Sequence, residues 1–96
     1  MTAELREDLI RKLEVLKVGQ IGVVMIKFHG KVIYAHFAKP MPDNWLTWAE
    51  TLTGLGTEPT PISFERLLTQ LLEILEVIRV VGDGKLNGSW WEVTNG

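Results

Sequence analysis

Residues 20–38 read QIGVVMIKFHGKVIYAHFA. Two runs rich in Val, Ile, Phe and Tyr, residues 20–28 and 31–38, flank the pair His29-Gly30, which suits a two-residue turn that needs positive φ angles. The pattern predicts a β-hairpin. If these two residues form the loop, one face of the hairpin is strongly apolar and is expected to face the core, with the opposed pairs Phe28/Lys31, Ile26/Ile33, Val24/Ala35 and Gly22/Phe37.

The opposite face of this hairpin is more apolar than an antiparallel sheet normally shows to water. Its side chains are Lys27, Val32, Met25, Tyr34, Val23, His36, Ile21 and Ala38. We therefore expect this face to be covered. Either one of the chain's own helices or a second subunit would serve as the cover.

An amphipathic helix is predicted before the hairpin, at about residues 3–17. Thr2 is available as its N-cap, and Gly19 follows its last turn. One side of this helix is apolar and carries Leu5, Leu9, Leu13 and Leu16, with Ile10 beside them.

Two more helices are predicted after the hairpin. Asp43 can cap a short helix that ends near Gly54 and places Trp45, Trp48, Ala49 and Leu52 on one stripe. Thr60 can cap the next helix, with Pro61 in its first turn and an end near residue 76. The buried stripe of that helix comprises Phe64, Leu67, Leu68, Leu71, Leu72 and Leu75.

A strand is predicted from about residue 77, where β-branched residues take over. Either Asp83-Gly84 or Asn87-Gly88 can reverse the chain before a final strand at about residues 89–94. The predicted order is α-β-β-α-α-β-β. This order describes a single α+β domain, residues 1–96, in which two hairpins form an antiparallel sheet packed against helices.

The composition is that of an ordinary globular domain. The chain has 96 residues and a mass of 10.9 kDa, with 46% hydrophobic and 23% charged residues, which excludes disorder and collagen-like repeats. The absence of cysteine excludes disulfides and thiolate chemistry. No apolar run reaches the roughly 20 residues of a membrane helix, and the N-terminus mixes acids and bases where a signal peptide is apolar. We expect a cytoplasmic protein with no membrane partner.

Charge is distributed unevenly along the chain. Residues 1–17 are balanced, residues 18–42 contain three lysines and no acid, and residues 43–84 are acidic. The net charge of −2 argues against wholesale nucleic-acid binding but leaves a local basic surface on the hairpin. The acidic middle could also face the basic hairpin of another copy.

The sequence contains no catalytic, cofactor or metal motif. Both Gly-Lys pairs lack the glycine that a phosphate loop needs five residues earlier, and Lys85 stands where a calcium loop needs an oxygen ligand. We interpret His29 as a turn residue and His36 as a packing residue. The prediction is a protein that is not an enzyme and has no catalytic residue, metal or cofactor. A pocket between sheet and helices that holds His36 and an acidic residue would reverse that prediction.

Four tryptophans in so short a chain call for an explanation. Trp45 and Trp48 are expected in the core, whereas Trp90 and Trp91 must point to opposite faces of a strand, so that one of them can serve a contact. The candidate interaction surface, in which an aromatic anchor has a basic rim, comprises Lys27, Lys31, Tyr34, His36, Lys39, Trp90 and Trp91.

Two functions fit these features. The first is a small regulatory or protein-interaction module that binds itself, another protein or both, and forms a homo-oligomer. The second is a nucleic-acid-binding regulator that uses the basic hairpin. Residues 67–93 resemble the end of a winged-helix domain, which would place Lys85 near the tip of the wing.

Overall fold

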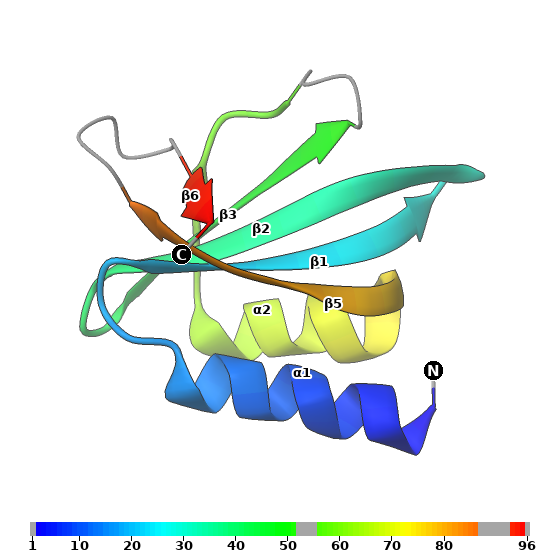
Figure 1. The fold of residues 1–96 in the computed structure, drawn as a ribbon, viewed down its shortest axis with the longest axis horizontal. Coiled ribbons are helices and arrows are strands. Elements are labelled where there is room, and N and C mark those ends of the chain that lie inside the picture. Colours follow the sequence, from blue (N-terminus) through cyan, green and yellow to red (C-terminus); the bar gives the residue numbers. More distant parts are fainter. Residues whose placement is uncertain (1, 52–55, 87–92, 96) are drawn as a thin grey trace.

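Within residues 2–51, 56–86 and 93–95, which the computed structural model describes, six strands form one antiparallel sheet in the order β4-β3-β2-β1-β5-β6. The two helices lie side by side on one face of this sheet (Figure 1). In chain order the elements are α1 (Ala3–Val15), β1 (Gln20–Phe28), β2 (Lys31–Met41), β3 (Asn44–Thr51), β4 (Thr60–Ile62), α2 (Phe64–Thr69), the π-helical η1 (Gln70–Ile74), β5 (Glu76–Leu86) and β6 (Val93–Asn95). The predicted α+β class is confirmed, with more strands than expected.

The first hairpin has the predicted turn and register. His29 and Gly30 adopt φ angles of 50° and 77°, as a two-residue loop of this kind requires. Phe28 lies opposite Lys31, and the pairing continues without a shift to Ile21 opposite Ala38. The face predicted to be apolar is the one that packs on the helices.

Pairing of β1 with β5 joins the two halves of the chain into one sheet. Two residues of β5, Ile78 and Val81, have no partner on β1 and form β-bulges, which increase the local twist of a strand. In Figure 1, β5 accordingly starts beside the helices and ends on the opposite side of the sheet. Because β5 runs through Asp83 and Gly84, these residues are not the predicted turn. Asn87-Gly88 and most of the predicted strand at residues 89–94 lie outside the described residues.

The helix predicted at residues 43–54 is wrong, because Asn44–Thr51 form β3, antiparallel to β2. A two-residue turn joins the two strands. Trp45 and Trp48 are both buried, but on opposite faces of the sheet and not on one helical stripe. Since both faces are buried here, β3 lacks the alternation of apolar and polar residues that identifies a strand in a sequence.

The next helix begins later than predicted. Thr60 and Pro61 belong to β4, and the N-cap is Ser63, whose Oγ accepts a hydrogen bond from the N–H of Arg66 at 3.2 Å. The predicted end near residue 76 is confirmed, since η1 gives way to β5 there. Within the predicted stripe, Leu67 and Leu71 are buried, while Phe64 is exposed.

The main core lies between the helices and the sheet. Thr2 caps α1 as predicted, since its Oγ1 accepts a hydrogen bond from the N–H of Leu5 at 3.2 Å. Fully or nearly fully buried side chains from both layers meet here, among them Leu9, Leu13, Val24, Phe37, Leu67 and Leu71. Both described helices cover this face, so within the described residues no helix covers the other face of the hairpin.

One edge of the sheet is closed by the segment that follows β3. The N–H of Ala49 donates to Oγ1 of Thr57 at 2.9 Å, and the N–H of Thr57 donates to the carbonyl of Ala49 at 2.8 Å. Strand residues two apart direct their backbone amides to the same side, so Thr47, like Ala49, directs its N–H and C=O groups toward β4. Pro61 lies opposite Leu46, one position along, and its nitrogen therefore faces the outer side of β4. A proline nitrogen carries no hydrogen, so the outer side of β4 lacks a donor at this position.

Candidate functional site

The sheet face away from the helices carries an ordered grid of side chains. Directly opposed residues of antiparallel strands point to the same face, so the pairings of β5, β1, β2 and β3 define its rows. From the β1–β2 turn inward, the rows are Glu76-Lys27-Val32, Arg79-Met25-Tyr34-Glu50, Gly82-Val23-His36-Trp48 and Gly84-Ile21-Ala38-Leu46.

In the two inner rows, the residues that belong to β1, β2 and β3 are buried within the single chain. Ile21 and Ala38 have no exposed surface, and Val23, Leu46 and Trp48 form a second cluster with them. This is the end at which β5 bends to the side of the sheet away from the helices (Figure 1). These residues therefore need no second subunit to exclude water.

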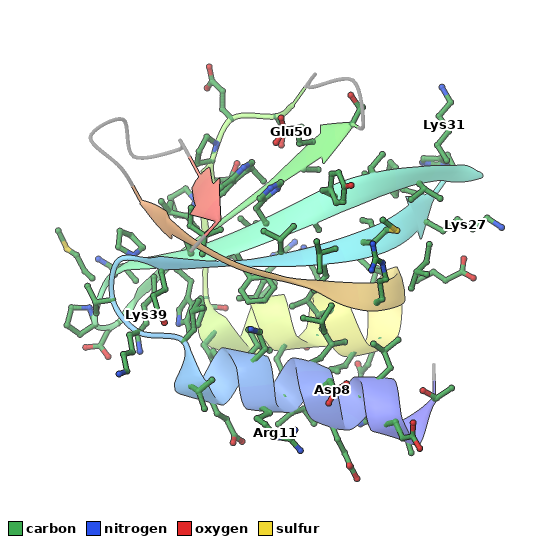
Figure 2. All side chains as sticks on the ribbon, in the orientation of Figure 1. Asp8, Arg11, Lys27, Lys31, Lys39 and Glu50 are labelled. Atoms are coloured by element: carbon green, nitrogen blue, oxygen red, sulfur yellow. The ribbon has the colours of Figure 1, made fainter. Side chains whose placement is uncertain are left out.

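The two outer rows are open, and their seven residues Met25, Lys27, Val32, Tyr34, Glu50, Glu76 and Arg79 are called here the open sheet face. Lys27, Val32 and Arg79 are exposed, and Met25, Tyr34 and Glu50 are half-buried. Neither helix covers this face, and Figure 2 shows Glu50 on the side of the sheet away from the helices. Its centre is apolar and its corners are charged.

His36 lies in the buried row next to the open sheet face. The residue is 5% exposed, and its ring stacks on Trp48 with centroids 5.1 Å apart and ring planes 5° from parallel. Nε2 lies 3.8 Å from Oε2 of Glu50, which is longer than a hydrogen bond, and Nδ1 is buried without a partner. Burial lowers the pKa of His36 from 6.5 to about 4, so the imidazole is neutral at pH 7.

Acid is expected to destabilise the protein through His36. The unfolded chain takes up this proton near pH 6.5 and the folded protein only near pH 4, so folding stability falls as the pH drops between these values. The loss attributable to His36 should be about 2–3 kcal/mol at pH 4.5 relative to pH 7. Urea unfolding of wild type and His36→Phe at both pH values gives this loss as the difference between the pH dependences of their unfolding free energies. The carboxylates are the same in both proteins and cancel in that difference. Equal pH dependence of the two would contradict the assignment.

The structure separates the residues of the predicted interaction surface. Tyr34, His36 and Lys27 share the face away from the helices, whereas Lys31 and Lys39 belong to the positions of β2 that face the helices. Lys27 and Lys31 lie at one end of the molecule and Lys39 at the other (Figure 2). Trp90 and Trp91 lie outside the described residues. The predicted basic rim is therefore not continuous.

A second surface feature is an open groove at the other end of the sheet. Lys39 does not line it, but the Nζ of Lys39 lies 5.5 Å from the centroid of the ring of Trp45, which does. The groove has a volume of about 630 Å³ and lies between the β2–β3 turn and β4, with Met41, Asn44, Trp45 and Pro61 among its lining residues. Asp43 is its one ionisable lining residue, which gives the groove no pair of groups for acid–base chemistry.

Three charged residues of the open sheet face were not predicted from the sequence. Arg79 and Glu76 join it because β5 pairs with β1, a contact between distant parts of the chain. Glu50 joins it because β3 is a strand and not a helix. In a strand, residues 46, 48 and 50 share one face and residues 45, 47 and 49 the other. Both sets contain a tryptophan and another apolar residue, so no polar–apolar alternation marked this segment as a strand.

Among the described residues, no group of three or more His, Cys, Asp or Glu side chains could hold a metal ion. No helix in that part of the chain is long and apolar enough to span a bilayer. The chain matches no protein-family model, no curated protein and no solved structure.

Proposed function

We propose that this protein is a small, non-enzymatic interaction module that self-associates through the open sheet face. The observation that carries the proposal is a half-buried Tyr34 beside Met25 and Val32 on a sheet face that neither helix covers. An aromatic anchor surrounded by apolar and then charged side chains is the usual anatomy of a protein-binding patch.

A non-enzymatic role is supported by the environment of His36. The imidazole is buried against Trp48 and does not reach hydrogen-bond distance of Glu50. A general base must contact the proton that it removes. The acidic neighbour that would favour an enzyme is present, but on the sheet face away from the helices.

Nucleic-acid binding has less support. A phosphate-binding surface needs cations along one track, whereas Lys39 lies at the far end of the molecule from Lys27 and Lys31 (Figure 2). Lys27 is also directly opposite Glu76 on β5. The exposed side of α2 and η1 carries Glu65 and Glu73, which would repel phosphate from this helix.

Replacing Tyr34 by glutamate is expected to raise the dissociation constant for self-association at least tenfold, because the new charge would be buried without a partner. Far-UV circular dichroism should stay close to that of wild type, because Tyr34 is only half-buried. Light scattering coupled to size-exclusion chromatography, over a range of protein concentrations, measures the mass.

The matched control is Ile74→Glu, which places the same charge on an exposed apolar position of η1, away from the open sheet face. It should associate like wild type. A Tyr34→Glu variant that associates as strongly as the control would remove this face from consideration. Adding a DNA duplex at low and moderate salt tests the alternative, since a salt-sensitive complex would favour phosphate binding.

A further inference from the structure

We propose that two copies of the chain stack their open sheet faces about a two-fold axis parallel to the strands, so that Arg79 of each copy pairs with Glu50 of the other. This inference rests on the proposed function and specifies its partner and geometry. It follows from the order of side chains in one row of the grid, Arg79-Met25-Tyr34-Glu50.

Symmetry leaves two simple ways to place these faces together. When two sheets pack face to face, the two-fold axis lies in the plane between them. An axis parallel to the strands reverses the order of the row, so that Arg79 meets Glu50 at both ends. An axis across the strands sets Arg79 on Arg79 and Glu50 on Glu50 if it passes through this row, and sets Arg79 on Glu76 if it passes between the two outer rows. Glu76 already lies opposite Lys27 in its own sheet, and only the first arrangement gives Glu50 a cationic partner. Charge complementarity therefore favours the first arrangement.

The centre of the row fits the same arrangement. Reversal of the row places Tyr34 of each copy on Met25 of the other copy, so this contact forms twice. A thioether against an aromatic ring is a favourable contact. In the outer row, Lys27 of one copy meets Val32 of the other, where its aliphatic stem can cover the exposed valine.

Both charged groups are available for this pairing. Within the described residues, Arg79 makes no ion pair, and the only basic side chain within 4 Å of a Glu50 carboxylate oxygen is that of His36. His36 is neutral at pH 7 and so offers Glu50 no positive partner.

The rotation between packed sheets does not remove these contacts. Aligned sheets cross at about 30°, and Arg79 and Glu50 lie about 7 Å from the axis, given strands about 4.8 Å apart. The resulting offset is about 4 Å, which the arginine side chain can span. Two rows across four strands cover only a few hundred Å² per copy, below the roughly 800 Å² of a standard interface. The dimer is therefore expected to be weak and transient.

Charge reversal tests this geometry. The variants Arg79→Glu and Glu50→Arg should each raise the homodimer dissociation constant at least about tenfold, because two attractive pairs become repulsive. An equimolar mixture should recover dimers as tight as wild type to within about threefold, since each interface end then joins a glutamate to an arginine. Sedimentation equilibrium from about 10 μM to about 1 mM covers the range expected for so small an interface.

Matched controls are Arg66→Glu and Glu65→Arg, which make the same charge changes on α2 in the helix layer. These variants and their mixture should associate like wild type. If Tyr34→Glu dissociates the protein but the mixture of Arg79→Glu and Glu50→Arg stays monomeric, the proposed two-fold axis is wrong. Self-association through the open sheet face is then still supported. If wild type is monomeric at about 1 mM, self-association itself is overturned. Recovery of dimers only in the mixture would establish the arrangement.

Discussion

Gly22→Ala is expected to destabilise the fold by about 3 kcal/mol or more. Gly22 lies directly opposite Phe37 in the first hairpin, and a Cβ at this position would come within 2.3 Å of Cε2 and 2.5 Å of Cζ of the Phe37 ring. That ring has no exposed surface and cannot move away without displacing the core. Such overpacking commonly costs about 1–3 kcal/mol, and more where the neighbour cannot yield.

A double mutant separates this clash from a general strand effect. Phe37→Leu alone should destabilise the protein because it leaves a cavity. Combined with Gly22→Ala, the smaller side chain makes room for the methyl group, so the double mutant should lose less stability than the sum of the single variants. Strictly additive losses in urea unfolding would refute the ring contact as the cause.

Leu71→Ala is expected to cost about 2–5 kcal/mol in urea unfolding. Leu71 is 1% exposed and projects from η1 into the core between helices and sheet. Ile74→Ala, at a position of η1 that is 68% exposed, should stay within about 0.5 kcal/mol of wild type. A loss at Ile74 as large as that at Leu71 would mean that the buried side of this segment is misassigned.

Local sequence patterns were sufficient for the first hairpin and for α1. His29 and Gly30 combine a turn signal with apolar runs of matching length, so turn, register and core face all follow from residues close in sequence. Thr2 and the leucines of α1 likewise carry a local helix signal.

Non-local pairing explains the errors. In β3 both sheet faces are buried, so Trp45 and Trp48 fit a helical spacing as well as a strand. The bulges at Ile78 and Val81 are set by the pairing of β5 with β1, and nothing in their own segment specifies them. The same dependence on non-local pairing explains which residues of the candidate site could be predicted. Tyr34, His36 and Lys27 could be placed on one face from the hairpin alone, whereas Arg79 and Glu50 come from strands whose position depends on the whole sheet.

The closed edge beside β3 limits how far such molecules can assemble. An exposed strand edge can recruit the edge of another molecule, which can recruit a third, and growth of that kind ends in fibrils. Here Thr57 occupies the amide and carbonyl of Ala49, and Pro61 offers an incoming strand no donor on the outer side of β4. Addition of strands at this edge is therefore disfavoured, while the proposed face-to-face contact about a two-fold axis is complete with two molecules. The closed edge is thus compatible with the proposed pairing and disfavours the growth of polymers from this edge.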